Sequence, residues 1–221
     1  MDAAGVDRAC INGAIHGDAK RGNDLVASFV EQAPDRFIPV AFISPHYPDE
    51  AIAELERCFD ELGSKFLKIY PDFLGRPQDD PVYFPAFEFC NDRDIAVLHH
   101  ASYLFDPPDL TLYNRYSALH ERFPRVKWVL AHSGAGNDWD AVEATRDIPN
   151  LYLETSNLRG PANAIERVVE TVGADKVLYG SDMPVFDARH QVGRVVTSKI
   201  SKRAKQQILG INAMNLLGLG H

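Results

Sequence analysis

The sequence of 221 residues contains little cysteine and no long apolar run. Its three cysteines, Cys10, Cys58 and Cys90, are widely spaced and form no Cys-x-x-Cys pair, which argues against a disulfide framework and a thiolate zinc site. We therefore expect a reducing, cytoplasmic location. No apolar run approaches the roughly 20 residues that a membrane-spanning helix needs. The opening MDAAGVDRAC also lacks the basic and then apolar order of a signal peptide, so we expect a soluble protein with no membrane partner.

The sequence also lacks any basic stretch that would offset its acidic balance, a formal net charge of -8. This charge argues against a binding surface for nucleic acid or for an anionic membrane. The densest basic cluster, TSKISKRAKQQ near the C-terminus, is explained by a solvated helix face. We expect a small-molecule substrate as the partner.

What the sequence does have is a regular alternation of strand-like and helix-like segments. Its apolar share of 45% is ample for a core, and its length fits a single domain over residues 1–221. Short apolar, β-branched runs recur at intervals of roughly 24 to 31 residues, about the length of a strand, a helix and two loops. In chain order these runs are RACING, FIPVAFIS, KFLKIY, IAVLHH, VKWVLAH, NLYLETS and KVLYGSD. Helical patterns such as DEAIAELERCFDELG and ANAIERVVETVG lie between them.

The nearly continuous apolar runs are typical of strands in a parallel sheet that is covered on both faces, and the alternation with helices makes this an α/β fold. Two architectures fit this pattern, the open doubly wound sheet and the eight-stranded TIM barrel. No G-x-G-x-x-G follows the first strand, which disfavours a nucleotide-binding open sheet. Polar residues instead follow several different strands, as they do in barrel active sites. The sequence therefore predicts a barrel.

The spacing also predicts which strand of this (β/α)8-type barrel is missing. Stepping back one period from the first strand-like run lands about 20 residues before Met1. The opening MDAAGV has the pattern of a last helical turn with Gly5 as its cap. We therefore expect an N-terminally truncated barrel domain without its strand 1. The strands on either side of the gap would then expose unpaired edges, which predicts a homodimer or poor solubility.

Side chains suited to catalysis or metal binding follow four of the predicted strands. They are Lys68 and Tyr70, His99 and His100, His132, and Asp182. The carboxyl ends of parallel barrel strands share one face, so these side chains are expected to converge. Because successive side chains of a strand alternate, His99 and His100 cannot both face the interior. Histidine and aspartate together supply ligands for a divalent ion such as zinc, although each residue alone also has a purely structural explanation.

Nearly the whole chain resembles the amidohydrolase-related metallo-hydrolases and decarboxylases, the group that includes aminocarboxymuconate semialdehyde decarboxylase. The motifs that carry the resemblance are GVDRACI, KIYP, VLHHAS, VLAHSGAG, NLYLETS, LYGSDMP and ILGINAMNLLGL. The combination of GSD followed by proline with the helical ILGINA ending is the most specific part. The resemblance implies a distorted TIM barrel that binds one divalent metal, with zinc as the expected ion.

The resemblance also implies a role for each residue at the strand ends. His100 matches the metal ligand of the fifth strand, because Ala101 and Ser102 follow it as small residues do in the family. His132 matches a general acid or base beside the metal-bound water. Asp182 matches the aspartate that binds or orients the metal and its water.

Four further residues are predicted to bind substrate. Lys68 and Tyr70 match a stretch that lines the site in the family. Arg159 and Arg189 lie on loops after the last two predicted strands, where a guanidinium could hold a substrate carboxylate.

The sequence departs from the family pattern at one point, because it contains no His-x-His, the pair of metal ligands on the family's first strand. His16 and His46 follow predicted strands singly, and we interpret both as loop histidines. A catalytic zinc normally takes three protein ligands. A third ligand besides His100 and Asp182 would have to come from His132, His99, a carboxylated Lys68 or a separate polypeptide. We therefore expect weak metal binding and little activity from this chain alone.

These observations lead to a main functional hypothesis and two alternatives. The main hypothesis is a metal-dependent hydrolase that acts on a small carbonyl or carboxylate substrate through metal-activated water. The first alternative is a decarboxylase or hydratase of the same family, a carbon-carbon lyase. The second is a catalytically impaired relative that serves as a structural or interaction module.

Overall fold

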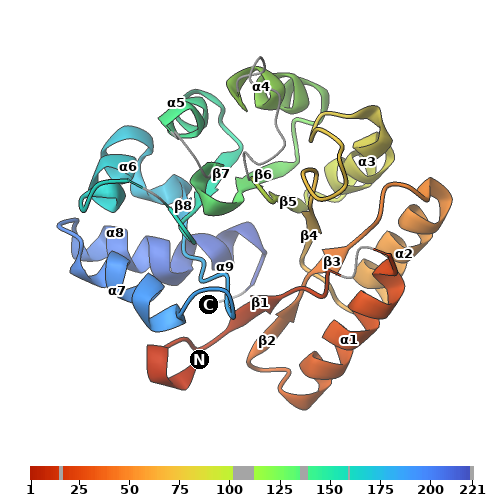
Figure 1. The fold of residues 1–221 in the computed structure, drawn as a ribbon, viewed down its shortest axis with the longest axis horizontal. Coiled ribbons are helices and arrows are strands. Elements are labelled where there is room, and N and C mark those ends of the chain that lie inside the picture. The colour runs from red at the N-terminus through yellow and green to blue at the C-terminus, as the bar shows by residue number, and fades with distance from the viewer. Residues whose placement is uncertain (15–16, 102–111, 135–138, 159, 220–221) are drawn as a thin grey trace.

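The computed structural model describes residues 1–14, 17–101, 112–134, 139–158 and 160–219. Within these residues the chain alternates between short strands and longer helices (Figure 1). The strands are β1 (Ala9–Ile11), β2 (Phe37–Pro39), β3 (Ala41–Phe42), β4 (Phe66–Ile69), β5 (Ala96–His99), β6 (Lys127–Leu130), β7 (Leu151–Glu154) and β8 (Val177–Leu178). The helices are α1 (Ala19–Gln32), α2 (Pro48–Asp60), α3 (Phe84–Asp92), α4 (Leu112–Arg122), α5 (Trp139–Asp147), α6 (Ala164–Val172), α7 (Ala188–Thr197), α8 (Lys202–Gln206) and α9 (Asn212–Leu216).

The strands pair in parallel and in chain order. One sheet contains β1 and β2, and the other runs from β3 to β8. Val40 alone separates β2 from β3, and its N–H donates to the Ile11 carbonyl at 3.0 Å. The predicted strand at FIPVAFIS is therefore one extended segment that takes part in both sheets. The alternation predicted from the sequence is confirmed, with a strand at each expected position.

Figure 1 shows the strands curving around a common centre with the helices on the outside, the arrangement of a TIM barrel. Among the described residues no pairing joins β1 to β8. The ring of strands is thus open at this position. None of the described helices is long and apolar enough to cross a membrane.

The two faces of the sheet bury different residues. Side chains on the outer face, such as Leu67, Val97 and Leu130, pack against the helices in the main core. On the inner face Phe66 forms a smaller apolar cluster with Val40 and Ala96, and Leu98, Leu216 and Leu217 pack against it. The C-terminal leucines of the chain therefore close the apolar part of the interior.

Alternation along β4 and β5 then decides what lies beyond this cluster. Two residues after Phe66, the same face carries Lys68, and two residues after Leu98 it carries His100. His99 points the other way and is 1% exposed. Its ring lies among the rings of Phe87 and Trp128, at centroid distances of 6.1 and 5.5 Å. The interior thus changes from apolar to polar toward the carboxyl ends of the strands.

The N-terminal turn confirms one prediction about local structure. Residues Asp2–Ala4 form a 3₁₀ turn, and Gly5 caps it with the left-handed backbone angles φ 66° and ψ 30°. The Gly5 N–H donates to the Asp2 carbonyl at 3.0 Å. Glycine adopts this conformation without the steric cost that a Cβ would bring.

The expectation of an unpaired edge at the last strand is wrong. The Tyr179 N–H, just after β8, donates to the Ile208 carbonyl at 2.9 Å. Asn212 Nδ2 donates to the carbonyls of Ala174 and Val177, both at 2.7 Å. The C-terminal helical segment therefore satisfies backbone groups that a neighbouring strand would otherwise pair. The sequence did not reveal this because the edge is covered by a helix, whereas strand spacing concerns only strand-to-strand pairing.

Candidate functional site

Unusual backbone conformations gather at the carboxyl ends of the last three strands. His132 and Ser133 after β6, Asn157 after β7 and Asp182 after β8 all have positive φ angles, between 50° and 60°. Such angles are uncommon for residues other than glycine and cost of order 1 to 3 kcal/mol each. They persist where the surrounding structure holds a side chain in a particular direction. This edge of the molecule is thus the candidate functional site.

Lys68 on β4 carries a buried positive charge in the interior. The residue is 5% exposed, and burial lowers its pKa to about 8, although the negative charges of Glu154, Asp182 and Asp72 act in the opposite direction. Its Nζ lies 4.8 Å from the centre of the Tyr70 ring. The charges of three carboxylates therefore act on the Lys68 ammonium.

Tyr70 and Phe73 place aromatic rings beside this charge cluster. The Tyr70 hydroxyl donates to Asn12 Oδ1 at 3.0 Å. Its ring centre lies 5.2 Å from that of His100, and the Phe73 ring centre lies 5.1 Å from His100. Burial raises the pKa of Tyr70 to about 12, and the charges of Asp182 and Asp72 act in the same direction. Tyr70 therefore stays protonated as a hydrogen-bond donor at neutral pH.

His100 is held by Asp72, a residue that the sequence did not single out. The two carboxylate oxygens of Asp72 lie 2.8 and 2.9 Å from His100 Nδ1, and the Asp72 side chain is only 6% exposed. An ionised carboxylate can only accept hydrogen bonds, so Nδ1 carries the hydrogen. Among the described residues no hydrogen bond to His100 Nε2 is found, and this atom has the chemistry to bind a substrate or a metal ion. The only sequence signal was an acid two residues after Tyr70 in KIYPDF.

His132 lies next to His100, as predicted. The two ring centres are 5.1 Å apart and the rings are nearly perpendicular. His132 Nδ1 lies 2.9 Å from Ser156 Oγ and 3.1 Å from the Ser156 carbonyl oxygen. Burial lowers the pKa of His132 below its ordinary value; Lys68 and His100 act in the same direction, whereas Glu154 and Asp182 oppose the shift. Residues that are far apart in the sequence thus form one polar cluster.

Glu154 at the end of β7 is the second group that sequence reasoning missed. Its carboxylate accepts hydrogen bonds from the His132 N–H at 3.2 Å and from both the N–H and the hydroxyl of Ser156 at 2.6 Å. A Cβ added to Gly180 would lie only 1.5 Å from Glu154 Oε1. The glycine of LYGSDMP therefore leaves the space that this carboxylate occupies. The signal was an acid that ends the apolar run NLYLETS.

Asp182 is exposed, unlike the buried Lys68 and His132. Its carbonyl accepts hydrogen bonds from the N–H groups of Val185 at 2.8 Å and Phe186 at 3.2 Å, which forms the turn after β8. Its charge raises the pKa of Lys68 and Tyr70. The carboxylate predicted from LYGSDMP is thus close to the interior cluster.

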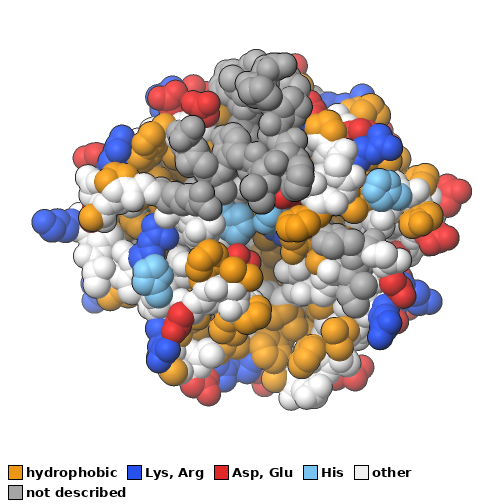
Figure 2. Space-filling model, in the orientation of Figure 1, with side chains coloured by type: hydrophobic (Ala, Val, Ile, Leu, Met, Phe, Trp, Pro, Cys, Tyr) orange, Lys and Arg blue, Asp and Glu red, His pale blue; other side chains and the backbone are white. Residues whose placement is uncertain are grey.

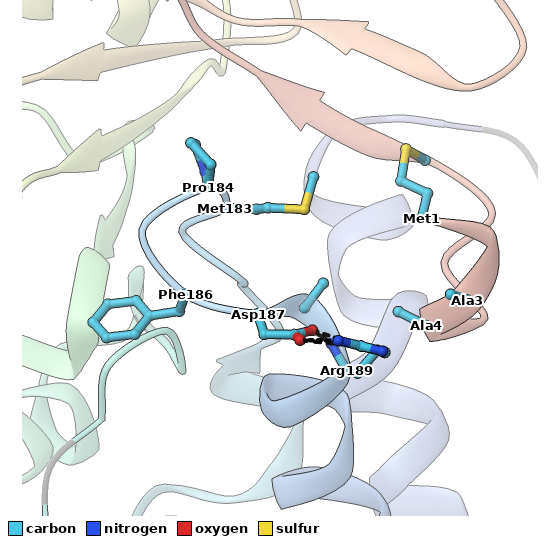
Figure 3. Close-up of a pocket in the computed structure, with 9 residues that line it drawn as sticks. Met1, Ala3, Ala4, Met183, Pro184, Phe186, Asp187 and Arg189 are labelled. Carbon is cyan, nitrogen blue, oxygen red and sulfur yellow. Dashed lines mark hydrogen bonds and ion pairs between the residues drawn. The ribbon is translucent and has the colours of Figure 1, made fainter.

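Of the two predicted arginines, the structure describes Arg189, which does not join this cluster. Arg159 lies outside the described residues. Arg189 is exposed and pairs with Asp187, with its Nε 3.0 Å from Asp187 Oδ1. Figure 3 shows this pair in a surface groove of about 400 Å³ that Met1 and Met183 also line. The pairing is local to the start of α7, where Asp187 also accepts a hydrogen bond from the Arg189 N–H.

The two single histidines differ in what the structure describes of them. His46 is exposed in the loop before α2, in agreement with its interpretation as a loop residue. His16 lies outside the described residues.

The described residues do not complete a metal site. No group of three or more His, Cys, Asp or Glu side chains among them is arranged to hold a metal ion. His100 Nε2 and the Asp182 carboxylate have suitable chemistry, but a catalytic zinc normally takes three protein ligands. The donor set of the described residues thus falls short of what a firmly bound ion requires.

Comparison with known proteins shows similarity over nearly the whole chain. A family model described as amidohydrolase matches residues 3–219. The 2-amino-3-carboxymuconate-6-semialdehyde decarboxylase of Dictyostelium discoideum is 26% identical over 234 residues, which cover 89% of this chain and 65% of that protein. The gamma-resorcylate decarboxylase of Polaromonas sp. (strain JS666 / ATCC BAA-500) is 26% identical over 253 residues, which cover 91% of this chain and 76% of that enzyme. The chain thus spans less than two thirds of the Dictyostelium protein.

Solved structures agree with this similarity. An uncharacterized TIM-barrel protein from Bordetella bronchiseptica superposes with a TM-score of 0.83 at 27% identity, covering 99% of this chain and 80% of that one. A dihydroxybenzoic acid decarboxylase from Polaromonas sp. JS666, with bound manganese and the inhibitor 2-nitroresorcinol, superposes with a TM-score of 0.77 at 22% identity, covering 100% and 84%. The predicted distorted TIM-barrel fold is confirmed, with the ring of strands open between β1 and β8 in the described residues.

Proposed function

Because the chain belongs to the amidohydrolase family, we propose that it is a decarboxylase, a carbon-carbon lyase that releases CO₂ from a small unsaturated or aromatic carboxylic acid. The names of its relatives support this alternative better than the main hypothesis of a hydrolase. The observation that carries the proposal is the buried Lys68 ammonium on the same interior surface as His132, whose Nδ1 is already committed to Ser156.

In the proposed reaction Lys68 and His132 have different roles. Loss of CO₂ leaves an electron pair on carbon, and a conjugated substrate passes this charge to an oxygen atom. The buried Lys68 ammonium would stabilise such an oxyanion. His132 would deliver a proton from Nε2 to the carbon. The lowered pKa of His132 makes its imidazolium a stronger acid, which favours this transfer.

The surroundings of His100 support a planar substrate. The rings of Tyr70 and Phe73 lie beside it, at centroid distances of 5.2 and 5.1 Å, and Phe73 is 58% exposed. Figure 2 shows histidine side chains near the middle of this face, with hydrophobic side chains beside and below them. Stacking against aromatic rings favours flat, conjugated acids over flexible aliphatic ones.

Manganese in the Polaromonas decarboxylase supports a divalent ion as the cofactor of this protein as well. We propose His100 and Asp182 as its ligands from this chain, with zinc and manganese as the ions to compare. Two ligands are expected to bind weakly. The incomplete ligand set is also the observation that favours the second candidate, a catalytically impaired relative.

The test is CO₂ release from carboxyl-labelled acids. The 221-residue protein, with and without added Mn²⁺ or Zn²⁺, is incubated with 2,6-dihydroxybenzoate, other hydroxybenzoates and unsaturated dicarboxylic acids, and labelled CO₂ is measured. Release that is lost in Lys68→Met and His132→Ala but kept in the surface variant Glu88→Gln supports the proposal. Cleavage of amides or lactones without CO₂ release would favour a hydrolase. Ligand binding without any turnover would favour the impaired relative.

A further inference from the structure

We propose that Glu154 and Ser156 are positioning residues that hold His132 in the tautomer with the hydrogen on Nδ1 and the lone pair on Nε2. This inference rests on the proposed function, because it gives His132 the role of proton carrier. The two residues lie at the end of β7, and His132 follows the neighbouring strand β6.

The direction of the hydrogen bonds follows from what each atom can donate. The Ser156 carbonyl oxygen, 3.1 Å from His132 Nδ1, can only accept. Ser156 Oγ lies 2.6 Å from Glu154 Oε2, and an ionised carboxylate also only accepts. The single hydroxyl hydrogen therefore points to Glu154, and Ser156 Oγ accepts from His132 Nδ1 at 2.9 Å. Both contacts of Nδ1 thus require a hydrogen on that atom.

Glu154 also fixes the backbone on both sides of this chain of hydrogen bonds. It accepts from the His132 N–H at 3.2 Å and from the Ser156 N–H at 2.6 Å. The first bond supports the left-handed conformation of His132, φ 60°. One carboxylate therefore sets the position of the histidine, the serine and the bond between them.

Gly180, two residues after the end of β8, makes room for this arrangement. A Cβ at this position would meet Glu154 Oε1 at 1.5 Å and Glu154 Cδ at 2.2 Å, so any other residue here would force the Glu154 carboxylate out of its position. The space left by this glycine therefore matches the position of the buried Glu154 carboxylate. Packing alone would be satisfied by an apolar side chain at position 154 and any small residue at 180.

The tautomer decides what His132 can do. With Nδ1 protonated, Nε2 of the neutral ring has a lone pair that can take up a proton and later deliver it. The opposite tautomer would place the lone pair on Nδ1, against the Ser156 oxygens. Glu154 and Ser156 thereby direct proton transfer to the Nε2 atom of His132.

The experiment measures the tautomer directly by ¹⁵N NMR of histidine-labelled protein, with His132→Ala to assign the signal. The parent is expected to show the Nδ1–H form. Glu154→Gln keeps the shape of the side chain but adds a donor that can turn the serine hydroxyl toward Nδ1, so a mixture with the Nε2–H form is expected. Ser156→Ala removes one of the two acceptors and should also raise the Nε2–H fraction. Glu88→Gln on α3 is the matched control for exchanging a carboxylate for an amide.

Activity provides a separate readout. In the decarboxylation assay kcat should fall at least roughly 10-fold in Glu154→Gln, with KM within about a factor of three, because only proton transfer is impaired. Glu154→Asp should recover part of the parental tautomer signal. An Nε2–H signal in the parent, or a signal that does not change in the folded variants, would overturn the inference. Absence of CO₂ release from the parent would refute the proposed function and leave the NMR test valid.

Discussion

Lys68 shows how much of the site could be predicted from single residues. Lys68, His100, His132 and Asp182 were predicted because each follows an apolar run, and the period of the barrel brings such positions together. The charges of Asp182 and Lys68 do both act on His132. What the period cannot specify is which hydrogen bonds form between strands.

Asp72 and Glu154 were missed for this reason. Each acts on a histidine far away in the sequence, His100 and His132, and neither lies in a recognisable spacing pattern. Arg189 was predicted to bind substrate, and its guanidinium pairs with Asp187 two residues away. A short-range partner of this kind was visible in the sequence.

The buried charge of Lys68 predicts a specific pH dependence of stability. Its pKa is about 8 in the folded protein, below the usual value of the unfolded chain. Between these two values the unfolded chain binds more protons than the folded one, so this group makes the folded state more stable as pH rises above 8. Below pH 8 the cost of burying the charge is fully present. Lys68→Met removes the effect.

We therefore expect the difference in unfolding free energy between the parent protein and Lys68→Met to change with pH. Relative to Lys68→Met, the parent should gain on the order of 3 kcal/mol of unfolding free energy between pH 7 and pH 10. Urea titrations at three pH values in that range measure it. Lys65→Met, at an exposed lysine just before the same strand, should show no such trend. A constant difference for Lys68→Met across this range would refute the buried charge.

Asp72→Asn is expected to weaken binding of a divalent ion. Asp72 holds His100 through Nδ1, and loss of a carboxylate that orients a metal-binding histidine typically costs roughly 10- to 100-fold in affinity. Titration of the apo protein with Mn²⁺, followed by electron paramagnetic resonance, gives the Kd. Asp49→Asn, at an exposed position in the first turn of α2, is the control. Equal affinity in the parent and Asp72→Asn would show that His100 does not bind the ion in this orientation.

At the scale of elements, the C-terminal segment replaces a strand. Asn212 at the start of α9 is 8% exposed and donates two hydrogen bonds, to the carbonyls of Ala174 and Val177. Sequence patterns recognised ILGINAMNLLGL as helical, but they contain no information about which sheet edge a helix will cover. The edge is decided by contacts between distant parts of the chain.

Asn212→Ala should therefore destabilise the protein although it favours helix formation locally. It leaves two carbonyls next to β8 without their donor, which costs about 1 to 3 kcal/mol for a buried unsatisfied group. Asn215→Ala, at an exposed position in the same helix, should be neutral or slightly stabilising. Guanidinium chloride denaturation of the parent and of both variants gives the free energies of unfolding to be compared. Equal stability of the two variants would show that the Asn212 bonds contribute nothing to holding the segment on β8.

At the scale of the whole molecule, the alternation of strands and helices was predictable because every unit buries one apolar run and one amphipathic helix. The break at Val40 was not, since FIPVAFIS is a single apolar run in the sequence. The open position between β1 and β8 agrees with the predicted gap in the ring, but only one of its two edges is unprotected. β8 is covered by the C-terminal segment, whereas β1 pairs with β2 alone among the described residues.

The edge of β1 therefore predicts where two copies of the chain would meet. The Ala9 N–H donates to the Arg36 carbonyl, and the Ile11 carbonyl accepts from the Val40 N–H, so both residues face the neighbouring segment. Because backbone groups alternate along a parallel strand, those of Cys10 face the free edge. An edge that presents such groups favours pairing with another chain. We expect a homodimer formed through β1.

The variant Cys10→Pro tests the proposed interface without disrupting the fold of the single chain. Proline is tolerated in an edge strand where the N–H faces solvent, so Cys10→Pro should fold while losing the edge donor. Light scattering after size-exclusion chromatography should show a dimer for the parent and for Cys10→Ala, and a monomer for Cys10→Pro. A monomeric parent would refute the dimer. A dimer that survives Cys10→Pro with unchanged affinity would place the interface elsewhere on the surface.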